Sequence, residues 1–154
     1  MARVSKSSQS VDKILIVEDD DDCRVAFTEL LQLWGYKVEA AKTGVQALEI
    51  ALKAPPVAAL IDIGLPDING CEVARKLREL GDKCPVLIAF SAGALPEDKD
   101  RGFAAGFEAY LVKPVDLDEL ASIFTARIPV NPPKSTLPPG PITMPQLVRT
   151  QRTR

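Results

Sequence analysis

The stretch VAALIDIGLPDINGCEVARKLR, residues 57–78, has the pattern expected of a strand, a turn and a helix in succession. Residues 57–61 are apolar without a break, which is typical of a strand buried on both faces of a parallel sheet. Asp62 follows directly, and Gly64 and Pro66 then indicate a turn. Apolar residues recur afterwards at helical spacing, at Val73, Ala74 and Leu77. This stretch therefore predicts a buried strand followed by an amphipathic helix.

The same alternation repeats between about residues 13 and 128. Further apolar runs lie at 14–17 and 86–90, with weaker ones at 38–41 and 109–112. The other helical sets are Phe27, Leu30, Leu31 and Trp34; Val45, Leu48 and Leu52; and Leu117, Leu120, Ala121 and Phe124, with a further helix at about 97–105. Each set is expected to form one buried stripe. Five such units with right-handed crossovers predict an α/β fold: a doubly wound, flavodoxin-like, five-stranded parallel sheet flanked by five helices.

Composition excludes several classes of protein. The chain has 154 residues, 46% hydrophobic and 26% charged, as in an ordinary globular domain. No apolar run approaches the ~20 residues of a membrane helix, so we expect no membrane association and a cytoplasmic location. Three cysteines without CxxC spacing indicate neither a disulfide framework nor a zinc site. Because the chain has no histidine, catalysis by a Ser-His-Asp or Cys-His arrangement is excluded.

The two ends differ from the middle of the chain. Residues 129–154 hold four basic residues, no acidic one and seven of the thirteen prolines, a composition that does not form a core. We predict a disordered segment at 1–11, a folded domain at 12–128, and a proline-rich, basic, disordered tail at 129–154. The tail is either a solvated linker or a polyproline segment that binds a partner. It contains no aromatic residue on which bases could stack, so no nucleic-acid partner is expected.

Polar residues follow most of the predicted strands, at the edge where ligands bind in open α/β sheets. They are Glu18 and Asp19 after the first strand, Asp62 after the third, Ser91 after the fourth, and Lys113 with Pro114 after the fifth. Singly, each has an ordinary explanation as a helix-terminal charge, a turn residue or a surface group. In the strand order 2-1-3-4-5, however, the first and third strands are neighbours. Glu18, Asp19 and Asp62 would then share one crevice.

Three carboxylates in one crevice need positive charge nearby. Two carboxylates about 4 Å apart repel each other by about 4 kcal/mol at an effective dielectric of 20. Mg²⁺ suits a site with one or two carboxylates, retained waters and a phosphoryl oxygen. The charges of the three carboxylates, one Mg²⁺ and Lys113 sum to zero. The sequence therefore predicts a neutralised Mg²⁺ site that admits a phosphoryl group.

Motifs around these residues resemble the response-regulator receiver domains of two-component signalling. They are ILIVEDD at 14–20, DIGLPDINGCEVARKLR at 62–78, the serine at 91, and AYLVKP at 109–114. All occur in register from residue 14 to about residue 124. The segment at 62–78 also resembles receivers attached to hybrid histidine kinases.

The resemblance implies a role for each acidic residue. Asp62 would be the phosphoacceptor. Glu18 and Asp19 would hold Mg²⁺ together with Asp62, and the backbone carbonyl of Gly64 would complete the set. Glu18 stands where many family members have aspartate, and Gly64 stands at a position that tunes loss of the phosphoryl group. Gly93 stands at a second such position, so the phosphoryl lifetime does not follow from the sequence.

The resemblance also implies how the phosphoryl group is sensed. Lys113 would contact the phosphoryl oxygens and precede a cis peptide bond to Pro114. The Ser91 hydroxyl would turn toward the phosphoryl group, and the Tyr110 ring would report the change. Signalling would then pass to a protein target through the face formed by the helix at 97–105, the strand at 109–112 and the last helix.

The implied function is a regulatory phosphoacceptor and not an enzyme in the usual sense. It would take a phosphoryl group from a histidine kinase or a histidine phosphotransfer protein, with only self-catalysed transfer and autodephosphorylation. One alternative is a phosphorelay or phosphate-sink receiver from a hybrid kinase. A second is a Mg²⁺-dependent phosphohydrolase, but the general acid that such an enzyme needs is missing where Gly64 follows Asp62 by two residues.

Two further alternatives differ in what they bind. The first is an interaction module that never uses Asp62, although the full set of charged groups would be costly to assemble without a metal. The second is a flavodoxin-like nucleotide-binding protein. The acidic loop at 18–22 argues against it, because this loop would repel phosphate where a glycine-rich loop should bind it.

Overall fold

The computed structural model describes residues 13–93 and 95–128, which form one parallel sheet covered on both faces. Its strands are β1 (Lys13–Val17), β2 (Lys37–Ala41), β3 (Ala58–Asp62), β4 (Val86–Ser91) and β5 (Ala109–Val112), in the order β2-β1-β3-β4-β5. The predicted sheet and strand order are confirmed. The predicted segments 1–11 and 129–154 lie outside the described residues.

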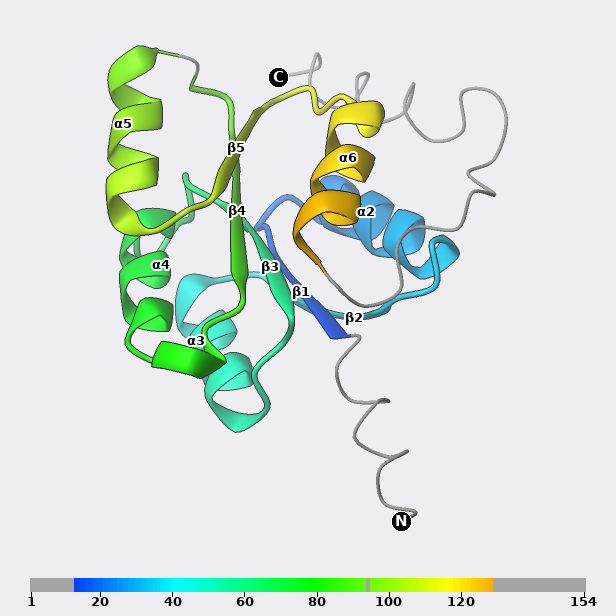
Figure 1. Cartoon of the computed structure of the whole chain (residues 1–154), viewed down its shortest axis with the longest axis horizontal. Helices are drawn as coiled ribbons and strands as arrows, with labels where there is room; N and C mark the ends of the chain where they lie inside the picture. Colours follow the sequence, from blue (N-terminus) through cyan, green and yellow to red (C-terminus); the bar gives the residue numbers. More distant parts are fainter. Residues whose placement is uncertain (1–12, 94, 129–154) are drawn as a thin grey trace.

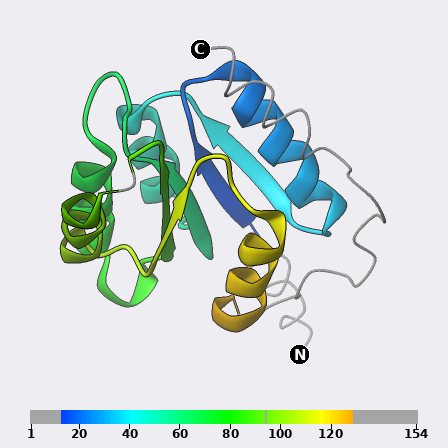
Figure 2. The ribbon, with the colours of Figure 1, turned by 90° about the horizontal axis from the view of Figure 1, so that it is seen from above.

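One helix follows each of the five strands, in agreement with the prediction. These helices are α2 (Asp21–Leu33), α3 (Gly44–Lys53), α4 (Gly70–Arg78), α5 (Pro96–Ala105) and α6 (Leu117–Arg127), with a short 3₁₀ turn, η1 (Gly81–Lys83), before β4. Helices α2 and α6 cover one face of the sheet, and α3, α4 and α5 cover the other (Figures 1 and 2). None of the helices in the described residues is both long and apolar enough to cross a membrane.

Alternate residues of the strands fill two separate cores. Ile14 and Ile16 pack with the α2 and α6 side, where Phe27 meets Phe90 edge to face at 5.2 Å between ring centroids. Leu15 and Val17 pack with the α3, α4 and α5 side. Because β1 is buried on both faces, its sequence is apolar at consecutive positions instead of every second one.

Helix α3 forms where it was predicted, but only one of the three residues predicted for its buried face, Leu48, packs against the core. Val45 and Leu52 are 50% and 63% exposed. The buried residues of α3 are small: Gly44, Ala47 and Ala51. The helix packs so closely against the β3–α4 loop that a Cβ on Gly44 would lie 2.5 Å from Cγ1 of Ile68. At this close approach only small side chains fit, and Val45 and Leu52 lie on the exposed side of the helix.

Side-chain caps fix where the helices begin at the carboxyl edge of the sheet. Asp20 caps α2 by accepting hydrogen bonds from the backbone N–H groups of Asp22 and Cys23, at 2.9 and 3.2 Å. Asp116 caps α6 by accepting from Asp118 and Glu119. Such caps satisfy backbone donors that have no partner within the helix. They fix the loops that follow β1 and β5, which carry candidate site residues.

Candidate functional site

Three carboxylates gather at the carboxyl edge of the two central strands. Glu18 and Asp19 follow β1, Asp62 ends β3, and β1 and β3 are paired side by side with Val17 opposite Ile61. One oxygen from each carboxylate lies within 4.8 Å of the others. Glu18 and Asp62 are buried, at 1% and 7% exposure, whereas Asp19 is exposed. This set of oxygen donors fits a hard divalent cation such as Mg²⁺.

Lys113 supplies the positive charge at this cluster. Its Nζ lies 3.0 Å from Oε1 of Glu18 and 3.2 Å from Oδ2 of Asp62. The ammonium group also lies over the ring of Phe90, 5.1 Å from its centroid. Its backbone N–H donates to the carbonyl of Ser91 at 2.9 Å, and the peptide bond to Pro114 is cis. Lys113 is therefore held by side-chain and backbone contacts from three neighbouring strands.

The charges of this cluster are not balanced by Lys113 alone. Burial and the nearby Asp62 carboxylate raise the pKa of Glu18 to about 7, against the opposing effect of Lys113. For Lys113, burial acts to lower its pKa, but the Glu18 and Asp62 carboxylates outweigh burial and raise it. With all three carboxyl groups ionised, the cluster and the Lys113 ammonium together carry a net charge of minus two. A divalent cation would neutralise this charge.

The loop after β3 holds the Asp62 carboxylate in place. The Gly64 N–H donates to Oδ1 of Asp62 at 3.0 Å, which leaves Oδ2 for Lys113. The Ile63 N–H donates to the carbonyl of Phe90, and the Gly70 N–H donates to the carbonyl of Ile63. A Cβ on Gly70 would lie 2.5 Å from the carbonyl oxygen of Asp62, so only glycine fits there. Both carboxylate oxygens of Asp62 therefore have fixed donors.

Ser91 and Tyr110 are linked through the backbone of Gly93. The Ser91 Oγ accepts a hydrogen bond from the Gly93 N–H at 3.0 Å, and the Tyr110 hydroxyl donates to the Gly93 carbonyl at 3.0 Å. The Tyr110 ring is buried against α5, where a Cβ on Gly102 would lie 3.0 Å from its Cδ2. A movement of the Ser91 hydroxyl would therefore release one of the contacts that hold Gly93.

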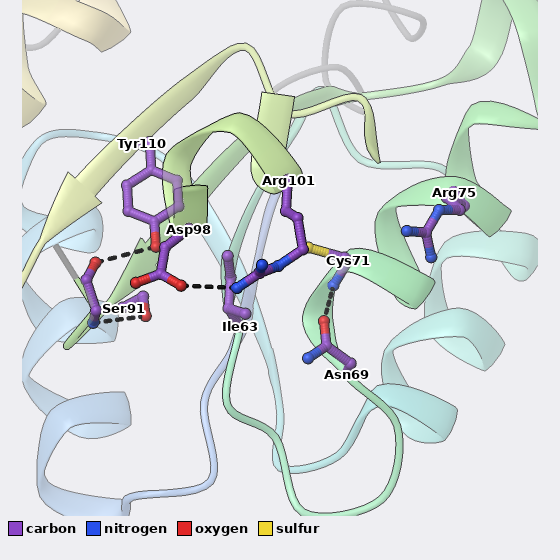
Figure 3. Close-up of a pocket in the computed structure, with 9 residues that line it drawn as sticks. Ile63, Asn69, Cys71, Arg75, Ser91, Asp98, Arg101 and Tyr110 are labelled. Atoms are coloured by element: carbon purple, nitrogen blue, oxygen red, sulfur yellow. Dashed lines mark hydrogen bonds and ion pairs between the residues drawn. The ribbon is translucent and has the colours of Figure 1, made fainter. Parts of the chain in front are cut away.

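A cavity of about 270 Å³ lies beside these two residues, between α4 and α5. Figure 3 shows Ser91, Tyr110 and Asp98 on one side of it, and Asn69 and Cys71 on the other. Asp98 binds Arg101 in an ion pair with an N–O distance of 2.7 Å. The space around the Ser91 and Tyr110 side chains is therefore only partly filled by protein.

The predicted candidates thus fall into two groups. Glu18, Asp19, Asp62 and Lys113 form the charged cluster, with Gly64 attached through its N–H. Ser91 and Tyr110 form a hydrogen-bonded unit with Gly93.

Sequence reasoning missed Arg24, which supports the acidic loop. Its guanidinium donates to the carbonyls of Glu18 and Asp19, at 2.9 and 3.4 Å, and pairs with Asp21. These contacts hold the backbone that carries both acidic side chains. A basic residue in the first turn of a helix opposes the helix dipole, and this unfavourable position was the available signal.

The sheet order, the acidic cluster and the lysine at the end of β5 together define a receiver domain, and comparison with known proteins agrees. The chain belongs to the response regulator receiver domain family, whose model matches residues 14–125. It is a receiver domain of two-component signalling.

Individual relatives are similar over this domain. The response regulator MprA of Mycobacterium leprae (strain TN) is 39% identical over 108 residues, which cover 70% of this chain and 47% of MprA. The chain therefore spans about half the length of the curated relatives it matches. A CheY-like receiver domain protein from Methanospirillum hungatei JF-1 has a TM-score of 0.70 and 31% identity, covering 75% of this chain and 92% of that one.

A second solved structure bears on the metal. It is the receiver domain of the sensor histidine kinase PA1611 from Pseudomonas aeruginosa PAO1, with a magnesium ion coordinated in its active site cleft. Its TM-score is 0.69 and its identity 30%, covering 76% of this chain and 97% of that one. Receiver domains bind Mg²⁺ at their acidic site, and the acidic cluster of this chain offers the same type of donor.

Proposed function

We propose that this chain is a phosphoaccepting switch in which Asp62 takes a phosphoryl group from a partner phosphohistidine with the help of Mg²⁺. Glu18, Asp19, Asp62 and the backbone carbonyl of Gly64 would hold the ion. The proposal rests on one observation. Oxygens of the three carboxylates lie within 4.8 Å of one another, and the Lys113 ammonium group forms ion pairs with Glu18 and Asp62.

The chain's own residues position and neutralise the reactants. An oxygen of the Asp62 carboxylate attacks phosphorus in line, the P–N bond to the donor imidazole breaks as the P–O bond forms, and the imidazole leaves. Bound Mg²⁺ supplies positive charge to the phosphoryl oxygens. Lys113, already 3.2 Å from Oδ2 of Asp62, donates to a phosphoryl oxygen on that side chain. The Gly64 N–H keeps the carboxylate oriented.

The response to the new charge begins at Ser91. Its hydroxyl turns to donate to a phosphoryl oxygen and so loses its contact with the Gly93 N–H. The Tyr110 hydroxyl is bound to the carbonyl of Gly93, so its ring position changes with that loop. The result is a shift between two populations of the α5, β5 and α6 face.

The proposed partners follow from this chemistry. A histidine kinase or histidine phosphotransfer protein in the cytoplasm supplies the phosphoryl group, and a protein target binds the α5, β5 and α6 face. The PA1611 domain belongs to a sensor histidine kinase, so a relay or phosphate-sink role is the second candidate. The two roles share the Asp62 chemistry and differ in whether a second phosphotransfer protein takes the group from Asp62.

The test is phosphorylation with acetyl phosphate and Mg²⁺, followed by intact mass measurement and peptide mapping. We expect one phosphoryl group on Asp62, none in Asp62→Asn, and a reduced yield in Lys113→Ala. Asp82→Asn is the control, because Asp82 lies in η1, before β4, at the opposite edge of the sheet. A modified Asp62→Asn protein, or modification of wild type without any divalent cation at the same rate, would reject the proposal.

A further inference from the structure

The loop between β3 and α4, residues 63–69, is pinned at both of its ends. The Ile63 N–H donates to the carbonyl of Phe90 at 3.1 Å, and the Gly70 N–H donates to the carbonyl of Ile63 at 2.9 Å. Gly64, the proposed carbonyl ligand, lies just inside the first of these contacts and is itself exposed. The Gly64 N–H also donates to Oδ1 of Asp62 at 3.0 Å, but these three contacts do not reach the outer part of the loop, residues 65–68.

Asp67 attaches this outer part of the loop. Its Oδ1 accepts a hydrogen bond from the Gly44 N–H and its Oδ2 accepts one from the Val45 N–H, both at 2.9 Å. These are the first two residues of α3, whose N–H groups have no partner within the helix. Asp67 itself is exposed, and both of these bonds join it to a separate element. One carboxylate therefore joins the loop to the start of α3.

Packing beside Asp67 shows that the β3–α4 loop and the start of α3 fit closely together. Ile68 lies against Gly44, where a Cβ would come 2.5 Å from Cγ1 of Ile68. Ile68 is also packed against the core on the α3 and α4 side. The hydrogen bonds of Asp67 and the contact of Ile68 with Gly44 thus act at the same place on α3.

We propose that Asp67 is a positioning residue for the cation site, because it fixes the loop that presents Gly64 beside Asp62. This inference rests on the proposed function, since it assumes that the site binds Mg²⁺. Asp67 touches neither the ion nor the phosphoryl group. Its effect is carried by the loop, from the α3 terminus to Gly64.

Helix α3 offers a matched control in Thr43. The Thr43 Oγ1 accepts from the Gln46 N–H at 3.1 Å and so caps the same helix from within its own segment. Thr43→Ala and Asp67→Ala each remove a side-chain cap from α3, but only Asp67→Ala also detaches the loop. Asp67→Asn keeps one acceptor oxygen and loses the second, so it is the conservative variant.

The experiment is calorimetric titration of the full chain with Mg²⁺ at one pH, together with urea unfolding of each variant. We expect the urea midpoint to fall in both Asp67→Ala and Thr43→Ala. The Kd for Mg²⁺ should rise about tenfold in Asp67→Ala, as for other residues that orient metal ligands, and less in Asp67→Asn. It should stay at the wild-type value in Thr43→Ala.

The outcomes separate this inference from the proposed function. If wild type does not bind Mg²⁺, the proposed function fails and the inference fails with it. If wild type binds Mg²⁺ and both Asp67 variants bind it equally well, only the inference is overturned. An equal loss of affinity in Thr43→Ala would also overturn it, because the effect would then come from the helix and not from the loop. Should Asp67→Ala fail to fold, the Kd of Asp67→Asn for Mg²⁺ is compared with those of wild type and Thr43→Ala instead.

Discussion

Glu18 shows at the residue scale how a buried acid is kept in the fold. Its carboxylate accepts hydrogen bonds from Lys113 Nζ and from the Asp20 N–H, both at 3.0 Å. These donors do not fully offset burial and the repulsion from Asp62, which raise the pKa of Glu18 to about 7. The cost of ionising a buried carboxyl group appears as a pH dependence of stability.

The first prediction concerns that pH dependence in the metal-free protein. The pKa of Glu18 is about 7 in the folded chain and 4.5 in an exposed carboxyl group. Between these values the folded state keeps a proton that the unfolded state has lost. The free energy of unfolding should therefore fall as pH rises through this window and level off above about 7. Urea unfolding at several pH values measures it.

Two comparisons separate Glu18 from the other carboxyl groups. In Glu18→Gln the fall between about pH 4.5 and about pH 7 should be smaller than in wild type, because glutamine does not titrate. Glu79→Gln, an exposed change at the end of α4, should keep the wild-type slope. Equal slopes in wild type and Glu18→Gln would show that Glu18 titrates normally.

At the scale of single elements, Gly64 in the β3–α4 loop and Gly70 at the start of α4 have different surroundings. A Cβ on Gly70 would lie 2.5 Å from the Asp62 carbonyl oxygen and 2.7 Å from the Ile63 Cα. A Cβ on Gly64 would meet only Oδ1 of Asp62, at 3.9 Å, an ordinary contact. The two positions therefore form a matched pair, six residues apart, at the loop and at the helix that follows it.

The second prediction is that Gly70→Ala destabilises the chain and Gly64→Ala does not. Backbone cannot yield as a flexible side chain does, so we expect Gly70→Ala to lower the free energy of unfolding by about 2 kcal/mol. Gly64→Ala should stay within about 0.5 kcal/mol of wild type. Urea unfolding of both variants measures the difference. Similar losses in the two variants would contradict the close packing at Gly70.

The third prediction concerns α5 and the ring of Tyr110. Gly102 lies in the middle of α5, and alanine there gains about 1 kcal/mol of helix propensity. Its Cβ would lie 3.0 and 3.1 Å from two ring carbons of Tyr110, so the ring must shift. We expect little net change in stability but a displaced ring. Fluorotyrosine incorporation with ¹⁹F NMR measures it, since the chain has only two tyrosines.

Tyr36 serves as the internal reference for that experiment. It packs against Phe124 on the opposite face of the sheet, so its ¹⁹F signal should not move in Gly102→Ala. Ala104→Gly is the matched variant, because it changes helix propensity at an exposed position of α5. An unmoved Tyr110 signal in Gly102→Ala, or an equal shift in Ala104→Gly, would contradict close contact between Gly102 and the ring.

At the scale of the whole molecule, the sequence predicted what depends on periodicity and strand order. The apolar runs located the five strands within one residue at each end, and the strand order brought Glu18 and Asp62 together. Contacts between distant segments could not be predicted. Ala51 is buried and Leu52 exposed because of how closely α3 approaches its neighbours, which residue types do not reveal.

The same limit applies to contacts made by the backbone. Neither the bonds from Asp67 to the start of α3 nor the link between Ser91 and Tyr110 through Gly93 leaves a periodic pattern. A side-chain contact of Trp34 was equally unpredictable. Trp34 lies at the end of α2 remote from Glu18, and its ring packs on that of Phe124. Its fluorescence is therefore a poor reporter of the acidic site.

The last prediction joins the site to the stability of the whole fold. Mg²⁺ with beryllofluoride, a phosphoryl mimic, should bind only the folded chain, because Glu18, Asp19, Asp62 and Lys113 come from three separate strand ends. At a ligand concentration about 100-fold above Kd the gain is about 2.7 kcal/mol, which corresponds to a rise of roughly 5–10 °C in Tm for a domain of this size. Asp62→Ala removes the bonding oxygen and should show no rise from beryllofluoride, whereas Asp82→Asn should respond like wild type. Differential scanning calorimetry measures Tm. An equal rise in Asp62→Ala would mean that the mimic binds elsewhere and that Asp62 is not the acceptor.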